Sequence, residues 1–460
     1  MFARLFLYLK LLGFTLSISL KRLGIYLSTK IHRLRYRPVP DPRNVVIIGG
    51  SFAGYFLAKR LAESLPTGYR VVLIERHSHF HFTWNFPRAS VLSGQEANAI
   101  VPYPAHGPRS APDGAYVFKQ GTVTAIESGK VVLQDGSEIA YEYLAIATGS
   151  RSRYPEKLDG DGNGTGNVKA NCVRFFQEEQ HRIAAGQDIV VVGGGAAGVE
   201  VAADIRSKYP QKSVTLVHSR ENLLNNFDRE LHNIARKALE ELGVTLYLGE
   251  RVVGGLEGDD SKQVTLRSGK VIQCDTVIHC TGQAPNSSLL ATFSPDSVSA
   301  TTGAILVDKA LRVRNAPAYN NNIFALGDVV DLPGPKMGRA ASMQAFLVAE
   351  NIVRAIRADQ KRDGKRKETN VNTKTRATSS PALKEYTPSL IDSSIELTLG
   401  LGKSVTFISD GGGGHQHVSF ARAMPDHALH AAQMWRMMDA QPFVDPGDTD
   451  SDSAANVNGG

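Results

Sequence analysis

NVVIIGGSFAG, residues 44–54, is the stretch that decides the fold of this chain. It begins as a continuous apolar run typical of a strand buried in a parallel sheet. A glycine-rich turn then leads into a helical pattern, YFLAKRLAESL. A second apolar strand, RVVLI, follows at residues 70–74 and ends at Glu75. Strand, turn, helix and strand in this order predict a βαβ unit of the kind that binds a dinucleotide.

The same pattern occurs again later in the chain. The strand DIVVV at 188–192 leads into GGGAAG, then into the helical pattern VEVAADIRSKY and a strand at 213–217. Glu75 lies 26 residues after Gly49, and His218 lies 25 residues after Gly193, so the two units have nearly the same spacing. We therefore expect an α/β fold with two Rossmann-like dinucleotide-binding domains, the second inserted in the first, and a small C-terminal α+β region.

The first glycine-rich turn has the chemistry of a pyrophosphate site. Unpaired N–H groups and a partial positive charge at the start of the helix favour an anion there. Gly49 permits the tight turn and Gly54 allows close helix packing, although Ser51 takes the place of the usual middle glycine. Glu75 is placed to accept hydrogen bonds from ribose hydroxyl groups. The expected cofactor contacts are Gly49, Gly50, Ser51, Phe52, Ala53, Gly54 and Glu75.

The second turn fits the full glycine pattern through Gly193, Gly195 and Gly198. Its second strand ends in His218, followed by Arg220, where an NADH-binding unit usually has an acid. A carboxylate repels a 2′-phosphate, whereas histidine and arginine can bind one. The sequence therefore favours NADPH over NADH, and use of both nucleotides stays open. The alternative is that the two side chains simply end a strand in solvent.

Composition and turn signals divide the rest of the chain. Short strands alternate with tight turns from about residue 115 to Thr148-Gly149, and a later strand ends in Gly327-Asp328. The expected segments are a basic apolar leader at 1–42, an FAD-binding domain at 43–155 and 283–357, and an NAD(P)H-binding domain at 156–282. A disordered insertion at 358–382, a small region at 383–438 and a disordered tail at 439–460 complete the chain.

The leader is basic and has no acidic residue. Its first 40 residues contain eight Lys or Arg, which accounts for the formal charge of +7 and makes nucleic acid an improbable partner for the rest of the chain. A mitochondrial presequence, a membrane-surface helix, a transmembrane anchor and a disordered extension are the alternatives. N-myristoylation is excluded because no glycine follows Met1. We expect association with a mitochondrial or other intracellular membrane, with its cytoplasmic face as one option.

The order of these motifs resembles the pyridine nucleotide-disulphide oxidoreductase superfamily. Within it, the chain is similar to the apoptosis-inducing-factor-like group that contains ferroptosis-suppressor protein and is related to type II NADH dehydrogenases. The similarity is carried by VVIIGGSFAG, NFPRASV, VVVGGGAAGVEVAADIRSKYP, VTLVHSRENLL, IHCTGQAPNSS, FALGDVVDLPGPKM and ELTLGLGK. It implies FAD and NAD(P)H as cofactors and a quinone-like electron acceptor. A homodimer is possible.

The resemblance also implies roles for single residues. Arg88 would contact FAD, Val123 would meet the adenine through its backbone, and Asp328 would bind the ribityl or phosphate region. Glu200 would lie beside the nicotinamide, and Lys336 near the flavin ring, where a cation stabilises an anionic reduced flavin. These two are the expected catalytic residues. The implied FAD contacts also include Thr148 and Gly149.

The chain lacks the cysteine pair of a disulphide reductase. Cys274 and Cys280 lie six residues apart on one predicted strand, or about 20 Å, whereas a disulphide requires Cα atoms within about 7 Å. Electrons should therefore leave the flavin directly for a diffusible acceptor. The alternating residues His77, His79 and His81 suggest a flavin-domain loop rather than a metal site. Two further functions stay open: reduction of a soluble electron carrier, and a redox-responsive signalling protein.

Overall fold

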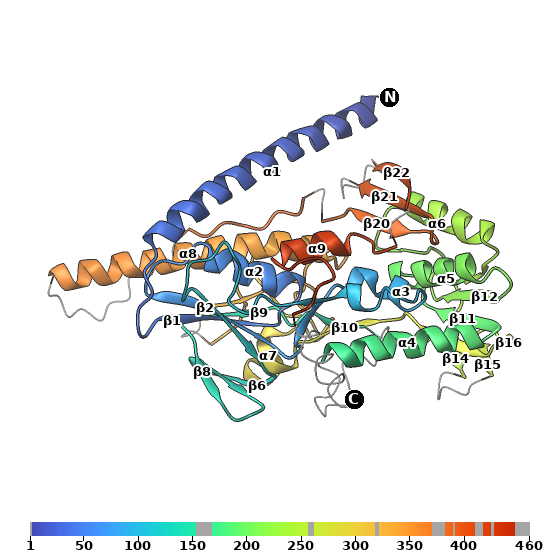
Figure 1. Cartoon of the computed structure of the whole chain (residues 1–460), viewed down its shortest axis with the longest axis horizontal. Helices are drawn as coiled ribbons and strands as arrows, with labels where there is room; N and C mark the ends of the chain where they lie inside the picture. The colour runs from blue at the N-terminus through green and yellow to red at the C-terminus, as the bar shows by residue number, and fades with distance from the viewer. Residues whose placement is uncertain are drawn as a thin grey trace, which may run out of the picture.

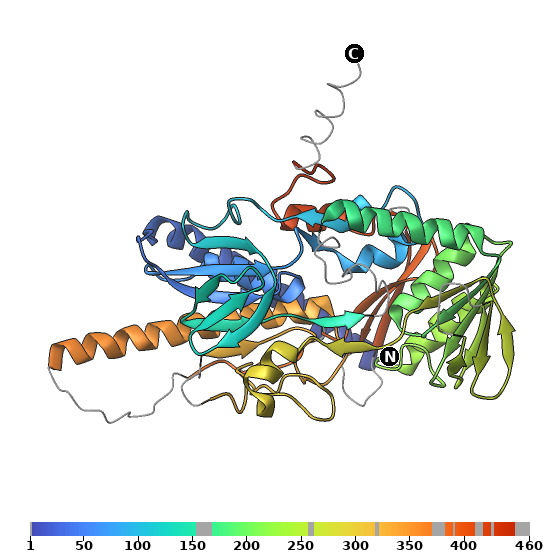
Figure 2. The ribbon, with the colours of Figure 1, turned by 90° about the horizontal axis from the view of Figure 1, so that it is seen from below.

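The computed structural model describes residues 2–152, 168–255, 262–317, 322–369, 382–389, 392–409, 417–424 and 427–446. Figures 1 and 2 show two α/β lobes side by side, and Figure 1 shows the long helix α1 (Phe2–Arg35) along one side of the molecule. The mixed α/β architecture with two parallel sheets confirms the expected fold class. The GDGNGTG loop at 160–166 lies outside the described residues.

The first lobe is built on a five-stranded sheet in the order β19-β9-β1-β2-β5, in which all neighbouring strands are parallel. Its strands are β1 (Arg43–Ile48), β2 (Tyr69–Glu75), β5 (Tyr116–Gln120), β9 (Tyr143–Ile146) and β19 (Ile323–Ala325). Helices α2 (Phe52–Ala62) and α8 (Gly338–Thr369) pack against each other, and their buried side chains share a core with one face of the sheet. The other face packs on an antiparallel meander, β6 (Val123–Glu127), β7 (Lys130–Leu133) and β8 (Glu138–Ala140).

The second lobe repeats this plan. Its parallel sheet has the order β13-β12-β11-β17, which corresponds to β5-β2-β1-β9 of the first lobe. The strands are β11 (Asp188–Val192), β12 (Ser213–His218), β13 (Thr245–Leu248) and β17 (Thr276–His279), with helices α4 (Lys169–Ala185), α5 (Ala196–Lys208) and α6 (Arg229–Glu241). A second meander consists of β14 (Val252–Gly254), β15 (Gln263–Leu266) and β16 (Val271–Gln273). The near-continuous valine and isoleucine runs form strands here because both faces of each sheet are buried.

Two short strands join the lobes. β10 (Ser150–Ser152) leaves the first lobe and β18 (Gln283–Pro285) returns to it, and the two pair antiparallel. The Thr148 hydroxyl donates to the carbonyl oxygen of Asn286 at 2.7 Å, and the Asn286 side-chain amide donates to the carbonyl oxygen of Thr148 at 2.9 Å. These hydrogen bonds join the two segments that connect the lobes. Both segments lie within a few residues of the domain limits expected at 155 and 282.

The C-terminal region adds a three-stranded antiparallel sheet of β20 (Ile395–Thr398), β21 (Lys403–Ser409) and β22 (His417–Ala423), followed by α9 (Ala431–Met437). Trp435 of α9 is buried, and its indole N–H donates to the carbonyl oxygen of Asn98 at 3.0 Å. This contact helps to hold α9 on the first lobe, whereas the buried side chains of β20 and β21 share a core with the second lobe. The shorter elements are β3 (His79–His81), β4 (Ile100–Pro102), α3 (Phe86–Ala89), α7 (Ser288–Phe293) and the 3-10 turn η1 (Thr83–Asn85).

The structure describes parts of both segments that were expected to be disordered. Helix α8 continues to Thr369, through the first twelve residues of the expected insertion, because its Lys-, Arg- and Glu-rich end has good helix propensity. Residues 439–446 also have a defined place, since Asp439 pairs with Lys59 at 3.0 Å and Asp445 pairs with Lys169 at 2.7 Å. Residues 370–381 and 447–460 lie outside the described residues.

Helix α1 turns its apolar side chains away from the body. Thr29 is buried and Ile25 and His32 are partly buried, so this face of the helix contacts the first lobe. The opposite face carries exposed apolar side chains at a spacing of three and four residues, Leu12, Leu16, Leu20, Leu23, Leu27, Ile31 and Leu34. No helix among the described residues has the length and apolar character needed to cross a membrane.

Candidate functional site

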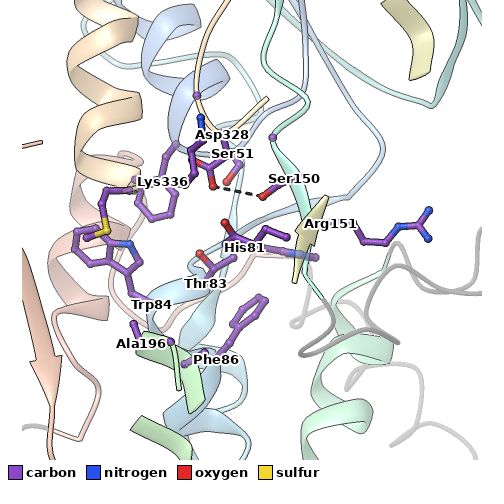
Figure 3. A pocket seen from close by; sticks show the side chains of 18 of the residues that line it. Ser51, His81, Thr83, Trp84, Phe86, Ser150, Arg151, Ala196, Asp328 and Lys336 are labelled. Carbon is purple, nitrogen blue, oxygen red and sulfur yellow. Dashed lines mark hydrogen bonds between the residues drawn. The ribbon is translucent and has the colours of Figure 1, made fainter. Parts of the chain in front are cut away.

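Both glycine-rich turns open into one cleft between the lobes, with a volume of about 1690 Å³ (Figure 3). The cleft is a natural consequence of the fold, because the turns follow β1 and β11 at the carboxyl ends of two parallel sheets. Most of the expected site residues line it: Gly49, Gly50, Ser51, Phe52, Ala53, Glu75, Val123, Thr148, Gly149, Gly193, Gly195, Glu200, His218, Arg220, Asp328 and Lys336. Gly54, Gly198 and Arg88 lie behind this lining.

The first turn has no room for side chains at its glycines. Gly49 has a φ of +98°, which favours glycine, and a Cβ on Gly54 would overlap the carbonyl oxygen of Gly49. A Cβ on Gly50 would lie 2.6 Å from the Tyr103 hydroxyl oxygen and 3.0 Å from the Cβ of Glu75. The main chain therefore forms the floor of the cleft at this point, and a ligand can approach it closely.

Glu75 and Tyr103 hold this turn in place. The N–H of Gly50 donates to Glu75 Oε2 at 2.5 Å, and the Tyr103 hydroxyl donates to the carbonyl oxygen of Gly50 at 2.9 Å. Glu75 also accepts from the main-chain N–H of His77 at 3.0 Å. Burial opposes ionisation of Glu75, but the hydrogen bonds from His77 and Gly50 outweigh it and lower its pKa to about 2. The carboxylate is therefore ionised and can accept a ribose hydroxyl.

The second turn repeats the first. Gly193 has a φ of +120°, and a Cβ on Gly198 would overlap the carbonyl oxygen of Gly193. Gly195 is different, because no protein atom lies within 4 Å of a Cβ built on it. It precedes α5 as its N-cap, and Ser51 occupies the same N-cap position before α2. A serine is therefore accommodated at the middle position of the first turn without strain in the protein.

His218 takes the structural place of Glu75 in the second lobe. The N–H of Gly194 donates to His218 Nδ1 at 3.0 Å, as the N–H of Gly50 donates to Glu75. Burial and the nearby Arg220 lower the pKa of the imidazole, so the ring is neutral at pH 7. The positive charge at this end of the cleft comes instead from Arg220 and Arg251, which are exposed and line it.

Asp328 and Lys336 face the same part of the cleft, as Figure 3 shows. Burial raises the pKa of Asp328, although Lys336 opposes this shift. The Ser150 hydroxyl donates to Asp328 Oδ2 at 3.5 Å. The Lys336 ammonium donates to the carbonyl oxygen of Val330 at 2.6 Å, and burial lowers the pKa of this amine. A carboxyl and an amine that each disfavour their charged form are typical of a site that binds a polar ligand.

Glu200 lies on α5, two residues after Gly198, and it is partly exposed to the cleft. Its Oε1 accepts from the N–H of Thr398 at 3.1 Å, which links α5 to β20. Burial, reinforced by the nearby Asp204, raises the pKa of Glu200 to about 8 even though the Thr398 bond opposes it. At neutral pH this side chain is therefore a carboxylic acid that can donate a hydrogen bond into the cleft.

Arg88, an expected FAD contact, lies behind the residues that line the cleft. The side chain is only 1% exposed, and its Nε and Nη2 donate to Asp204 Oδ2 and Oδ1 at 2.7 and 3.1 Å. Its Nη2 also donates to the carbonyl oxygen of Gly400 at 3.3 Å. The reason is that α3 packs directly on α5, which brings the guanidinium to a buried carboxylate of the other lobe.

The histidines beside Glu75 have protein partners. His77 Nδ1 lies 2.8 Å from Glu75 Oε1, and His79 Nε2 lies 2.8 Å from Asp445 Oδ2. The His81 ring lies against that of His77, with 4.1 Å between the centroids. Within the described part of the chain, no group of three or more His, Cys, Asp or Glu side chains is arranged to hold a metal ion. All three cysteines are free thiols.

One wall of the cleft was predicted only in part from the sequence. It is formed by Trp84 after β3, Arg339 at the start of α8, Glu396 on β20 and His430 before α9. Trp84 stacks on Phe52 with 5.4 Å between ring centroids and an interplanar angle of 20°. The four residues come from four separate elements. Three had a sequence signal: Glu396 begins ELTLGLGK, Trp84 directly precedes NFPRASV, and Arg339 lies two residues after the PKM motif. His430 gave none.

Two parallel-sheet domains with facing glycine turns and one shared cleft define an oxidoreductase of the two-dinucleotide class. Residues 43–345 match the family described as pyridine nucleotide-disulphide oxidoreductase, and the chain belongs to this family. Its cofactors are accordingly FAD and NAD(P)H. The glycine cradles, whose floors are main chain, fit the pyrophosphates of two such dinucleotides.

Similar proteins support this assignment. The chain is 33% identical to Fe-regulated protein 8 of Mycosarcoma maydis over 68% of this chain and 81% of that protein. It is 34% identical to ferroptosis suppressor protein 1 of Taeniopygia guttata over 68% of this chain and 80% of that protein. The solved structure of the sulfide:quinone oxidoreductase of Aquifex aeolicus has the same fold, with a TM-score of 0.64 and 18% identity over 86% of this chain and 90% of that one.

Proposed function

We propose that this chain is a membrane-surface NAD(P)H oxidoreductase that reduces a quinone-like acceptor by way of FAD. One observation carries the proposal: two dinucleotide cradles open into the same cleft, and the cleft continues to a third wall with an aromatic face. Two cradles account for two cofactors, and the third wall leaves space for an acceptor. When bound, FAD accepts a hydride from the nicotinamide and passes on its electrons.

The residues divide between two cofactor sites. The β1–α2 turn with Glu75 would hold the FAD pyrophosphate and ribose, Val123 the adenine, and Asp328 the ribityl region. The β11–α5 turn would hold NAD(P)H, with His218 at the adenosine ribose and Glu200 at the nicotinamide. Lys336 would lie beside the electron-rich end of the flavin ring. The chain's main contribution is to position two rings in contact and to exclude water from between them.

The thiols of this chain support direct transfer to a diffusible acceptor. All three cysteines lie in the described residues, and only Cys280 lines the cleft. Burial raises the pKa of the Cys280 thiol well above its usual value, which disfavours the reactive thiolate. A dithiol relay needs a second cysteine beside the first. The names of ferroptosis-suppressor relatives say nothing of an acceptor, but the structurally similar bacterial enzyme acts on a quinone.

We infer NADPH as the preferred donor, with NADH also accepted. His218 is neutral and already bonded to Gly194, so it neither repels a 2′-phosphate nor attracts one by charge. Arg220 and Arg251 supply the attraction from the rim of the cleft. Because both are exposed, solvent screens their charges, and the preference should be moderate.

Helix α1 is the proposed membrane contact. Its exposed leucine stripe faces away from the body, and its sequence has basic but no acidic residues. An exposed apolar face beside Lys and Arg suits an anionic lipid surface, where the helix lies in the interface. In Figure 1 the N-terminal half of the helix lies on the same side of the molecule as β22, and the two elements are in contact. β22 belongs to the same sheet as β20, which contributes Glu396 to the cleft, so a lipid-soluble acceptor would enter from this side.

An anaerobic experiment on the full chain tests the proposal. Purified protein should carry a yellow flavin, NADPH should bleach it, and a ubiquinone analogue should restore the oxidised spectrum. Folded protein without a flavin, or reduced flavin that no quinone reoxidises, would contradict the proposed function. A soluble carrier protein as a parallel acceptor separates the quinone from the alternative acceptor class.

A further inference from the structure

The wall formed by Trp84, Arg339, Glu396 and His430 contains charged side chains that neither proposed cofactor site uses. His430 Nε2 lies 3.3 Å from Glu396 Oε1, and Arg339 Nη2 lies 3.7 Å from Glu396 Oε2. Arg339 also donates to the Ser394 hydroxyl at 3.3 Å, and its guanidinium lies 5.2 Å from the centroid of the Trp84 ring. The cluster thus places an imidazole, a carboxylate and a guanidinium in contact with one another beside the Trp84 ring.

The backbone at His430 is unusual. Leu429 and His430 both have positive φ, at 46° and 65°, and both side chains line the cleft. Two consecutive non-glycine residues in the left-handed region cost conformational energy. Such strain persists where the surrounding structure holds it in place, and it is common at functional sites. The strain places the imidazole at the mouth of the cleft, with its side chain 47% exposed, while Glu396 below it is only 16% exposed.

The chemistry of the proposed reaction requires a proton at this place. Reduction of a quinone to a hydroquinone adds two electrons and two protons, whereas NAD(P)H gives up a hydride, which is two electrons and one proton. The balance is therefore NAD(P)H + H⁺ + quinone → NAD(P)⁺ + hydroquinone. An imidazole in contact with both solvent and an apolar cleft is suited to supply that proton, because a histidine exchanges protons near neutral pH.

We propose that His430, held by Glu396, is the proton donor to the acceptor, and that Trp84 and Arg339 seat the acceptor ring beside it. This role rests on the proposed function. In the step, the N–H bond at His430 breaks, an O–H bond forms on the quinone oxygen, and the imidazole regains a proton from solvent. The wall suits a quinone because it combines the apolar surfaces of Trp84, Met424 and Leu429 with donors at its edge.

The test compares two acceptors in the holoenzyme. Ferricyanide takes one electron and no proton, so it requires the electron path but not the donor. We expect H430Q to lower the turnover with a ubiquinone analogue about 100-fold, and to leave ferricyanide turnover and the bleaching of the flavin by NADPH unchanged. H181Q, at an exposed histidine of α4 outside the cleft, is the matched control and should change neither.

Two further readouts separate proton donation from a structural role. Added imidazole should restore part of the quinone turnover of H430A, because it can enter the space left by the side chain. Among the described residues, the charged groups near His430 include Glu396 on β20, with Arg339 of α8 and Arg422 of β22 near that carboxylate. E396Q should therefore shift the pH profile of quinone turnover to lower pH, since a neutral amide no longer stabilises the protonated imidazole.

The outcomes are distinct. Equal losses with ferricyanide and quinone in H430Q would overturn the donor role in favour of a structural one, as would full quinone turnover in that variant. Failure of imidazole to rescue H430A would also count against it. A wild-type chain that reduces ferricyanide but no quinone would overturn the proposed function itself, together with this role of His430.

Discussion

Arg88 of the first lobe and Asp204 of the second form a two-pronged ion pair that is almost fully buried, with side chains 1% and 0% exposed. The same guanidinium donates to Gly400 in the turn after β20, so one side chain connects both lobes and the C-terminal sheet. A buried charge without its partner is costly, whereas a satisfied pair fixes the geometry of the groups around it. The pair therefore helps to hold the two lobes, and with them the two cofactor cradles, in their relative positions.

The first prediction concerns this pair. R88M should lower the free energy of unfolding by about 3–5 kcal/mol, because it leaves the Asp204 carboxylate buried and alone. Denaturant unfolding of the flavin-loaded protein measures the loss. The control is R236M, which removes an exposed pair with Glu240, 54% and 50% exposed, and should cost less than about 1 kcal/mol. Equal costs in the two variants would contradict the assigned role.

The second prediction separates the two cradles. A methyl group on Gly54 or Gly198 would overlap a carbonyl oxygen of its own turn, so the turn must deform. Overpacking of this kind costs about 1–3 kcal/mol, equivalent to roughly 5- to 150-fold in an equilibrium constant. G54A should lose FAD, measured by the flavin absorbance per chain. G198A should retain FAD but bind NADPH more weakly in a fluorescence titration, and loss of FAD from G198A alone would contradict the assignment of the cradles.

The third prediction concerns nucleotide choice. H218E gives the second lobe the acid that Glu75 provides in the first. The carboxylate should still accept a ribose hydroxyl but repel a 2′-phosphate, so the affinity for NADPH relative to NADH should fall about 10- to 100-fold. Stopped-flow flavin bleaching at varied nucleotide concentration gives both affinities. H181E on the surface of α4 carries the same charge change away from the cleft, and an equal shift there would reject the assignment.

The fourth prediction follows from the raised pKa of Glu200, about 8. Between about pH 4.5 and 8 the folded state holds a proton on Glu200 that the unfolded chain has released. The contribution of Glu200 to stability is therefore most favourable below about pH 4.5 and declines as pH rises toward 8. E200Q should therefore stabilise the cofactor-free protein at pH 7, by about 1 kcal/mol after allowance for solvent in the open cleft. Near pH 4 the difference should vanish. Thermal unfolding at the two pH values measures it.

The same titration should affect turnover. Above pH 8 the ionised Glu200 favours the positive charge that develops on the nicotinamide as it gives up its hydride. Flavin bleaching by NADPH should accelerate as pH passes through about 8 in the wild type and stay flat in E200Q. A rise of the same size in E200Q would show that another group controls this step.

The fifth prediction concerns α1. Replacing Leu20 and Leu27 with glutamine removes two side chains from the centre of the exposed stripe, 62% and 53% exposed. If each contributes about 1 kcal/mol at the lipid interface, binding to vesicles containing phosphatidylserine should fall about 10- to 30-fold. Vesicle co-sedimentation measures it. S28Q, on an exposed position outside the stripe, should bind as the wild type does, and unchanged binding of the double variant would reject the lipid contact.

The two βαβ units could be predicted from the sequence alone. An apolar strand, a tight glycine turn and a helix are local features, and their chemistry depends on neighbours within about ten residues. Gly49, Gly54, Gly193 and Gly198 were predictable for this reason, since each turn can form in only one way. The same locality explains why the NFPRASV motif indicated Arg88 but not its partner carboxylate, Asp204.

Contacts between residues that are far apart in the sequence could be identified only from the folded structure. Asp204 lies 116 residues from Arg88, and Glu396 lies 34 residues from His430. The spacing of apolar residues along the sequence does not predict such contacts, because they form only when the lobes and the C-terminal sheet pack against one another. The orientation of α1 has the same origin: the leucine stripe is visible in the sequence, but only packing of Thr29 and His32 against the first lobe turns that stripe toward the outside.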